Sequence, residues 1–127
     1  MSHFSQIKTQ IRSLPALEAA LNDLGLSWKP GPQEIRGFRG QTDTAQVVMP
    51  QDNGYDVGFR WNGTEYELVA DLDFWQQAWS VDRFINKVSQ RYAYHAVVQS
   101  ASAQGFQVSE EQQQADGSVR LVVQRWR

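Results

Sequence analysis

Residues 54–70, GYDVGFRWNGTEYELVA, alternate between apolar and polar side chains on both sides of Asn62-Gly63. An Asn-Gly pair adopts the positive φ angles of a two-residue type I′ turn at little cost, and the twist of that turn matches the twist of antiparallel strands. The segment therefore predicts a β-hairpin with one aromatic and apolar face and one charged face. The register set by this turn would pair Trp61 with Thr64, Phe59 with Tyr66, Val57 with Leu68 and Tyr55 with Ala70.

Helical spacing marks two other segments. Leucines recur every three or four residues between Ser13, a suitable N-cap, and Gly25, a suitable C-cap, which predicts a short amphipathic helix. A second stripe of apolar residues begins after Ser80, another N-cap residue, and predicts a long helix that ends near Gln104.

The remaining segments predict strands and loops. Residues 3–11 alternate imperfectly and predict a first strand, and residues 34–49 predict one or two strands bent at glycines. Residues 28–33, WKPGPQ, are predicted to form a connecting loop because their two prolines lack backbone N–H donors. Asp116-Gly117 signals a second hairpin, with the polar residues 109–114 as an edge partner for a closing strand.

This order of elements lacks the regular strand–helix alternation of a parallel doubly wound sheet. It predicts a two-layer α+β fold, an antiparallel β-sheet packed against two helices. A chain of 127 residues has the usual size of one domain, so residues 1–127 are expected to fold as a single α+β domain.

Composition excludes several classes of function. The chain has no cysteine, so it forms no disulfide and holds no cysteine-ligated metal centre. A net charge of -2 and a pI near 5.6 argue against nucleic-acid binding, and a mean hydropathy of -0.54 argues against a membrane span. Residues 1–12 lack the pattern of a secretory signal, so we expect no export.

Titratable residues give no convincing catalytic or metal site. His3 lies near the terminus, and His95 lies on the apolar stripe of the long helix, where a hydrogen-bonded core histidine is the simpler interpretation. Glu65 and Glu67 share the expected solvent face of the hairpin. The segment 71–73, Asp-Leu-Asp, lacks the further ligands of a calcium loop. We therefore expect no metal and no cofactor, and leave open whether the chain is an enzyme.

Aromatic residues are the more informative group, since the chain contains five Trp, four Tyr and six Phe. Trp75 and Trp79 lie in the connection before the long helix and form the preferred partner-binding surface, with Arg36 and Arg39 as a polar rim. The alternative is that both indoles are buried and cap the core. Arg36 and Arg39 are also compatible with ordinary surface positions on a strand bent at the glycines.

A second hypothesis comes from a different class of function. The chain would bind a small ligand, or act as an enzyme, in a pocket between sheet and helices with His95 as the polar group. The lining of that pocket would be Tyr55, Phe59, Tyr66 and Tyr92. A third hypothesis, RNA binding through Arg36, Phe38 and Arg39, is disfavoured by the acidic pI.

Four segments resemble one family along nearly the whole chain: SHFSQIKTQI at the start, GYDVGFRWNGTEYELVADLDFWQQ in the middle, QRYAYH at 90–95, and DGSVRLVVQRW near the end. They are similar to the hypothetical chloroplast reading frame thirty-five family of cyanobacteria and algal plastids. The resemblance transfers no catalytic or binding residue. It implies a protein of the cyanobacterial cytoplasm or the plastid stroma, associated with photosynthetic physiology.

Relatives in that family are encoded near small ferredoxin-like proteins, and the resemblance therefore suggests a redox protein as a partner. Together with the aromatic surface, this favours a non-catalytic accessory protein that docks a protein partner. The oligomeric state stays open.

Overall fold

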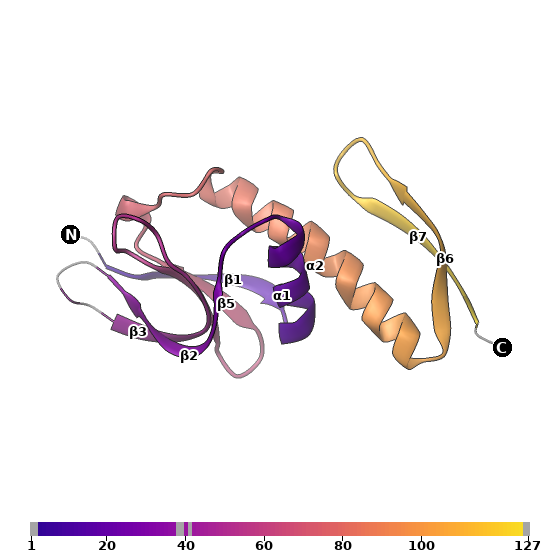
Figure 1. Ribbon diagram of the computed structural model, residues 1–127, viewed down its shortest axis with the longest axis horizontal. Coiled ribbons are helices and arrows are strands. Elements are labelled where there is room, and N and C mark those ends of the chain that lie inside the picture. Colours follow the sequence, from indigo (N-terminus) through magenta and orange to yellow (C-terminus); the bar gives the residue numbers. More distant parts are fainter. Residues whose placement is uncertain (1–2, 38–39, 41, 126–127) are drawn as a thin grey trace.

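The computed structural model describes residues 3–37, 40 and 42–125. Within these ranges, five antiparallel strands form one sheet in the order β1-β5-β4-β3-β2 (Figure 1). The strands are β1 (Ser5–Ile11), β2 (Lys29–Arg36), β3 (Thr42–Met49), β4 (Val57–Trp61) and β5 (Tyr66–Ala70). The helices are α1 (Leu14–Asp23), the short 3-10 helix η2 (Leu72–Phe74) and α2 (Val81–Ala103). The predicted α+β class is confirmed.

Side-chain caps set where both helices begin, as the sequence predicts. Ser13 Oγ accepts a hydrogen bond from the backbone N–H of Ala16, and Ser80 Oγ accepts one from Arg83. Gly25 and Gly105 follow the two helices with φ angles of 70° and 84°, a left-handed conformation that favours glycine after a helix end.

One hydrophobic core joins the sheet to both helices. Leu17 and Leu21 of α1 and Phe84 and Val88 of α2 belong to the same buried cluster as the inward residues of the sheet, which are Ile11, Val47, Met49, Val57, Phe59, Tyr66, Leu68 and Ala70. The rings of Phe59 and Phe84 stack with their centroids 6.5 Å apart. The helices therefore cover one face of the sheet, and this packing fixes the direction of α2.

The central hairpin forms as predicted, but the predicted two-residue turn is wrong. Asn62 Oδ1 accepts hydrogen bonds from the backbone N–H groups of Thr64 and Glu65, and Asn62 N–H donates to the Glu65 carbonyl. These contacts close a four-residue loop, so Trp61 pairs with Tyr66 and Phe59 pairs with Leu68. Because the register differs by two residues, the side chains of β4 and β5 keep their predicted faces. The prediction that the face of Glu67 is the solvent face is wrong, because Val69 is buried on that face and the Glu67 side chain is only 13% exposed.

The prediction of a loop at residues 28–33 is also wrong, because most of this segment belongs to β2. This strand lies at the edge of the sheet and pairs only with β3. Pro30 and Pro32 lack backbone N–H donors, which an edge strand tolerates because only one of its sides is paired. The register shifts between Pro30 and Gln33. A Cβ atom at Gly31 would collide with the carbonyl oxygen of Ala45, so the close approach of these strands requires glycine.

The other face of the sheet carries a smaller buried cluster. It consists of Ile35, Ala45, Val48 and Val69, with Phe4 packed against it. Gly58 lies beneath this cluster on β4, and a Cβ atom there would come within 2.9 Å of the Ala45 Cβ. Strand β4 is therefore buried on both of its faces.

The second predicted hairpin is also present, formed by β6 (Phe106–Gln113) and β7 (Val119–Arg125). It makes a two-stranded sheet of its own and lies at the far end of α2 from the main sheet (Figure 1). The Tyr94 hydroxyl on α2 donates a hydrogen bond of 2.9 Å to the Glu111 carboxylate. This hydrogen bond, and another from Gln90 Nε2 to the Asp116 carbonyl, connect the hairpin to α2.

Replacing Gly58 by alanine should destabilise the fold by about 1–3 kcal/mol, the usual cost of an extra methyl group in a packed core. The new methyl group would press on Ala45 Cβ and on Ile35 Cγ2. The double variant Gly58→Ala with Ala45→Gly should lose less stability than the sum of the single variants, because it removes the nearest contact. Urea unfolding measures both effects, and strictly additive losses would contradict this packing.

Candidate functional site

The connection between β5 and α2 holds Trp75 and Trp79 in fixed positions. The Trp75 indole N–H donates a hydrogen bond of 2.8 Å to the Trp79 carbonyl oxygen, and the Trp75 ring meets Phe84 edge-on at 5.2 Å. Lys87 Nζ lies 5.0 Å from the centre of the Trp79 ring, within the range of a cation–π contact. Both indoles are half-buried and pack against the main core, so each keeps part of its surface accessible.

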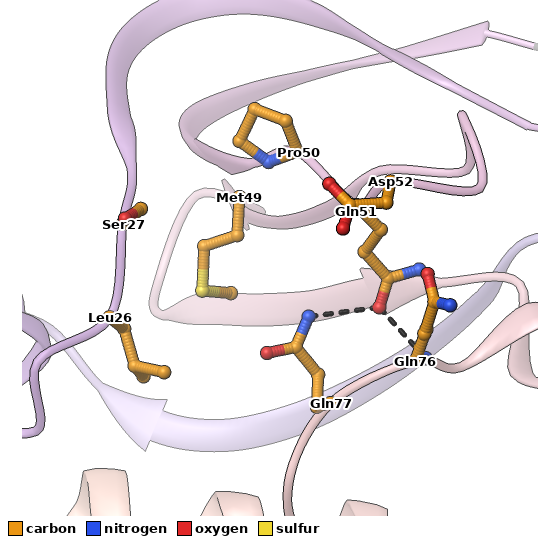
Figure 2. Close-up of a pocket in the computed structure, with 8 residues that line it drawn as sticks. All are labelled: Leu26, Ser27, Met49, Pro50, Gln51, Asp52, Gln76 and Gln77. Carbon is orange, nitrogen blue, oxygen red and sulfur yellow. Dashed lines mark hydrogen bonds between the residues drawn. The ribbon is translucent and has the colours of Figure 1, made fainter.

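Gln51 ties this connection to the loop after β3, residues 50–56. Its side-chain amide donates to the carbonyl oxygens of Tyr55 and Phe74 at 2.6 and 3.0 Å. Its Oε1 accepts from Gln76 N and Gln77 Nε2 at 2.9 and 2.8 Å (Figure 2). Gln51 is only 8% exposed. A buried amide with this many partners holds the loop and the connection as one unit.

A pocket of about 360 Å³ opens beside Gln51. Its lining consists of Leu26, Ser27, Met49, Pro50, Gln51, Asp52, Gln76 and Gln77 (Figure 2). Figure 2 shows Leu26 and Ser27 on one side and the polar side chains on the other, with Met49 between them. The amide of Gln51 is already used in the network above, so the groups that can pair with a bound molecule are the amides of Gln76 and Gln77, the Ser27 hydroxyl and the Asp52 carboxylate.

The pocket has no clear signature in the sequence. Gln51 and Gln76 are 25 residues apart along the chain, and no periodic pattern connects them. The only sequence signal was the pair Gln76-Gln77 next to the tryptophans.

Arg36, the last residue of β2, contacts the end of loop 50–56 at Asp56. Its guanidinium pairs with Asp56, with Nη2 2.7 Å from Oδ1 and Nε 3.0 Å from Oδ2. The Arg36 side chain is 59% exposed, whereas that of Asp56 is 4% exposed. Tyr55, the neighbour of Asp56, stacks on Phe74 at 4.0 Å. Loop 50–56 thus contacts Arg36 at one end and the tryptophan connection at the other, while Arg39 lies outside the described residues.

The residues of the alternative pocket fall into separate environments. Phe59 and Tyr66 are buried in the main core, and Tyr92 packs against it. Tyr92 also accepts hydrogen bonds from the backbone N–H groups of Arg12 and Ser13. Tyr55 stacks on Phe74, and His95 lies against α1. The pocket of Figure 2 is lined by none of these five predicted residues.

His95 belongs to an ionic cluster between α1 and α2. Asp23 Oδ2 accepts hydrogen bonds from Arg91 Nε and Nη2 at 3.0 and 2.7 Å, and it lies 2.6 Å from His95 Nε2. Burial raises the pKa of Asp23, but hydrogen bonds and charge from Arg91 and His95 together lower it below its ordinary value of 3.8. The cluster therefore links the C-terminal end of α1 to the middle of α2 through one carboxylate.

The described residues contain neither a metal-binding cluster nor a helix that could span a membrane. Within residues 3–37, 40 and 42–125, no three His, Cys, Asp or Glu side chains are arranged to hold a metal ion. In the same part of the chain, no helix has the length and apolar character to cross a membrane.

Replacing Gln51 by leucine should destabilise the fold by about 2–4 kcal/mol, because the Tyr55 and Phe74 carbonyls and the Gln76 N–H lose their partner. Gln51→Glu should also destabilise, since a carboxylate cannot donate to the two carbonyls. Gln77→Ala, which removes one hydrogen bond of the same network, is the matched control with a smaller loss. Urea unfolding measures these losses. A Gln51→Leu variant as stable as the wild type would contradict the stabilising role of the Gln51 network.

Replacing Asp23 by asparagine should cost up to about 1 kcal/mol at neutral pH, the scale of an exposed ion pair. The pKa of Asp23 is lower in the folded chain than its ordinary 3.8, so this stabilisation is complete above that value and is lost as the pH falls through the folded pKa. Thermal unfolding from about pH 7 to about pH 3 should show the variant and the wild type converging at the acid end. A difference that does not change with pH would contradict the contribution of this charge.

The sequence is similar to one protein family over most of its length. Residues 20–122 match the model of a family described as "Protein of unknown function (DUF1257)". The chain is 48% identical over 127 residues to the uncharacterised protein ycf35 of Guillardia theta, which covers 100% of this chain and 99% of the relative. It is 42% identical to ycf35 of Cyanophora paradoxa, with the same coverage, and 42% identical over 126 residues to ycf35 of Pyropia yezoensis, covering 99% and 98%.

No solved structure matches the chain. The matched relatives are plastid-encoded proteins of algae. Their similarity extends over the connection, the loop at residues 50–56 and both hairpins. The chain belongs to the DUF1257 family, together with the ycf35 proteins.

Proposed function

We propose that this chain is a non-catalytic interaction protein that docks a protein partner through the surface at the β5–α2 connection. Trp75 and Trp79 anchor the partner, and Arg36 and Arg39 form the polar rim. The observation that carries this proposal is the half-buried state of the two indoles, together with a pocket lined by Gln76 and Gln77, the two residues that follow Trp75 in the chain. Tryptophan and arginine are the residue types most enriched where protein interfaces bind tightly.

The rigidity of the connection supports this role. The Trp75 N–H is bound to the Trp79 carbonyl, and Gln51 holds the backbone on either side of Trp75. A surface whose side chains are already ordered loses little conformational entropy when a partner binds. The exposed parts of the two indoles are therefore suited to serve as preformed contact area.

The pocket lined by Gln76 and Gln77 supports a polypeptide partner. These two residues present amide groups, and Leu26 and Met49 add apolar surface. Amide side chains pair with the N–H and C=O groups of a peptide backbone. A loop of the partner inserted here would satisfy both kinds of group.

An acidic partner, such as a small ferredoxin-like redox protein, would meet Arg36 at the rim. Asp56 uses the Nε donor and one Nη2 donor of Arg36. An arginine carries five N–H donors, and the contacts among the described residues leave three for a carboxylate of the partner. In this proposal the protein works in the cyanobacterial cytoplasm or the plastid stroma.

Partner recovery from the native host tests the docking surface. Trp79→Ala should reduce the recovery of a specific partner by about tenfold or more, as expected for a buried anchor residue. Trp61→Ala is the matched control, because Trp61 is 40% exposed on the central hairpin and lies outside the connection. Quantitative mass spectrometry of the purified material measures recovery.

Thermal unfolding must confirm that both variants are folded. Trp75→Ala is the weaker probe, since its ring packs on Phe84 and its loss disturbs the core. Equal recovery with the Trp79→Ala and Trp61→Ala variants would contradict the proposed surface.

A further inference from the structure

A second pocket lies where β1 begins and β5 ends. Its volume is about 310 Å³, and its lining consists of His3, Ser5, Asp71, Leu72 and Asp73. It shares no lining residue with the pocket of Figure 2. Two carboxylates, one hydroxyl and one imidazole line it, and its lining includes no lysine or arginine. The local charge therefore favours a cation.

Asp71 carries an unexplained buried oxygen. The residue is 4% exposed, and its Oδ1 accepts a hydrogen bond of 3.2 Å from the backbone N–H of Asp73. Its Oδ2 is buried and has no hydrogen-bond partner among the residues that the structure describes. Leaving an acceptor buried and unpaired costs about 1–3 kcal/mol, and more when the group is charged. A ligand that meets this oxygen would remove the cost.

The donor set indicates which kind of cation. Carboxylate and hydroxyl oxygens are ligands of hard cations such as Mg²⁺ and Ca²⁺. In residues 3–37, 40 and 42–125, no three His, Cys, Asp or Glu side chains form a direct metal cage. Mg²⁺ suits such a site, because it binds through one or two carboxylates and keeps several waters. A pocket of about 310 Å³ leaves room for those waters.

We propose that this pocket binds one hydrated divalent cation of the Mg²⁺ type, with Asp71 Oδ2 as the anchoring ligand. Asp73 adds a second carboxylate at the same pocket, directly or through water. The ion would neutralise Asp71 and link the first strand to the start of the β5–α2 connection. This site is separate from the proposed docking function and does not depend on it.

Mn²⁺ is the probe, because it binds at Mg²⁺ sites and broadens nearby NMR signals. The untagged full chain is titrated with MnCl₂, since a histidine tag would bind the ion and would lie close to His3. We expect saturable broadening centred on the amides of Ser5, Asp71 and Asp73, reversed by excess MgCl₂. Asp71→Asn keeps the acceptor for the Asp73 N–H but removes the charge, and should weaken binding by about tenfold or more.

Asp52→Asn is the matched control, because Asp52 is an exposed carboxylate of the other pocket. This variant should bind Mn²⁺ as the wild type does, and Mg²⁺ should raise the Tm of both but not that of the Asp71→Asn chain. Broadening centred elsewhere, binding unchanged in Asp71→Asn, or no saturation at millimolar ion would each overturn the proposal. So would a preference for Zn²⁺ with no response to Mg²⁺, since that result would assign the site to the imidazole of His3.

Discussion

Both layers of the fold pack on the first three residues of β4, Val57, Gly58 and Phe59, which are buried on both faces of the sheet. On one face Phe59 packs against Phe84 and thereby sets the direction of α2. On the other face Gly58 leaves room for the side chains of Ala45 on β3 and Ile35 on β2, which belong to the smaller buried cluster. The central strand is thus covered by the helices on one face and by this smaller cluster on the other.

The position of the candidate site follows from this packing. Because Phe84 is fixed on Phe59, the first turn of α2 is fixed, and the Trp75 ring can rest edge-on against Phe84. Gln51 then bonds the backbone of the connection to the loop after β3. The two indoles, the pocket and Arg36 are therefore positioned by residues that are themselves part of the core or hydrogen-bonded to it.

Much of the fold was predictable, because its signals are local. Ser13 and Ser80 mark the helix starts through hydrogen bonds within one turn. Alternation with a period of two assigns the faces of the central hairpin. The loop length was not predictable from Asn62-Gly63 alone, since the Asn62 side chain captures the next two N–H donors and lengthens the loop. Strand β2 was missed because prolines are tolerated only at a sheet edge, and edge position is a property of the whole fold.

The candidate site was predictable only in part. The sequence alone indicates an aromatic surface at Trp75 and Trp79 and a polar rim at Arg36. The Gln51 network and the ion pairing of His95 were not predictable, because their partners are distant in sequence and meet only after folding. The same is true of the unpaired Asp71 oxygen, whose burial depends on the packing around the start of β1.

In the proposed function, the partner covers the β5–α2 connection. Hydrogen–deuterium exchange of the chain with and without its purified partner locates the covered surface, because it reports protection along the whole backbone. We expect new protection in residues 50–56 and 71–80 and little change in the hairpin formed by β6 and β7. Protection confined to that hairpin, or spread elsewhere with residues 71–80 unchanged, would contradict the proposed docking surface.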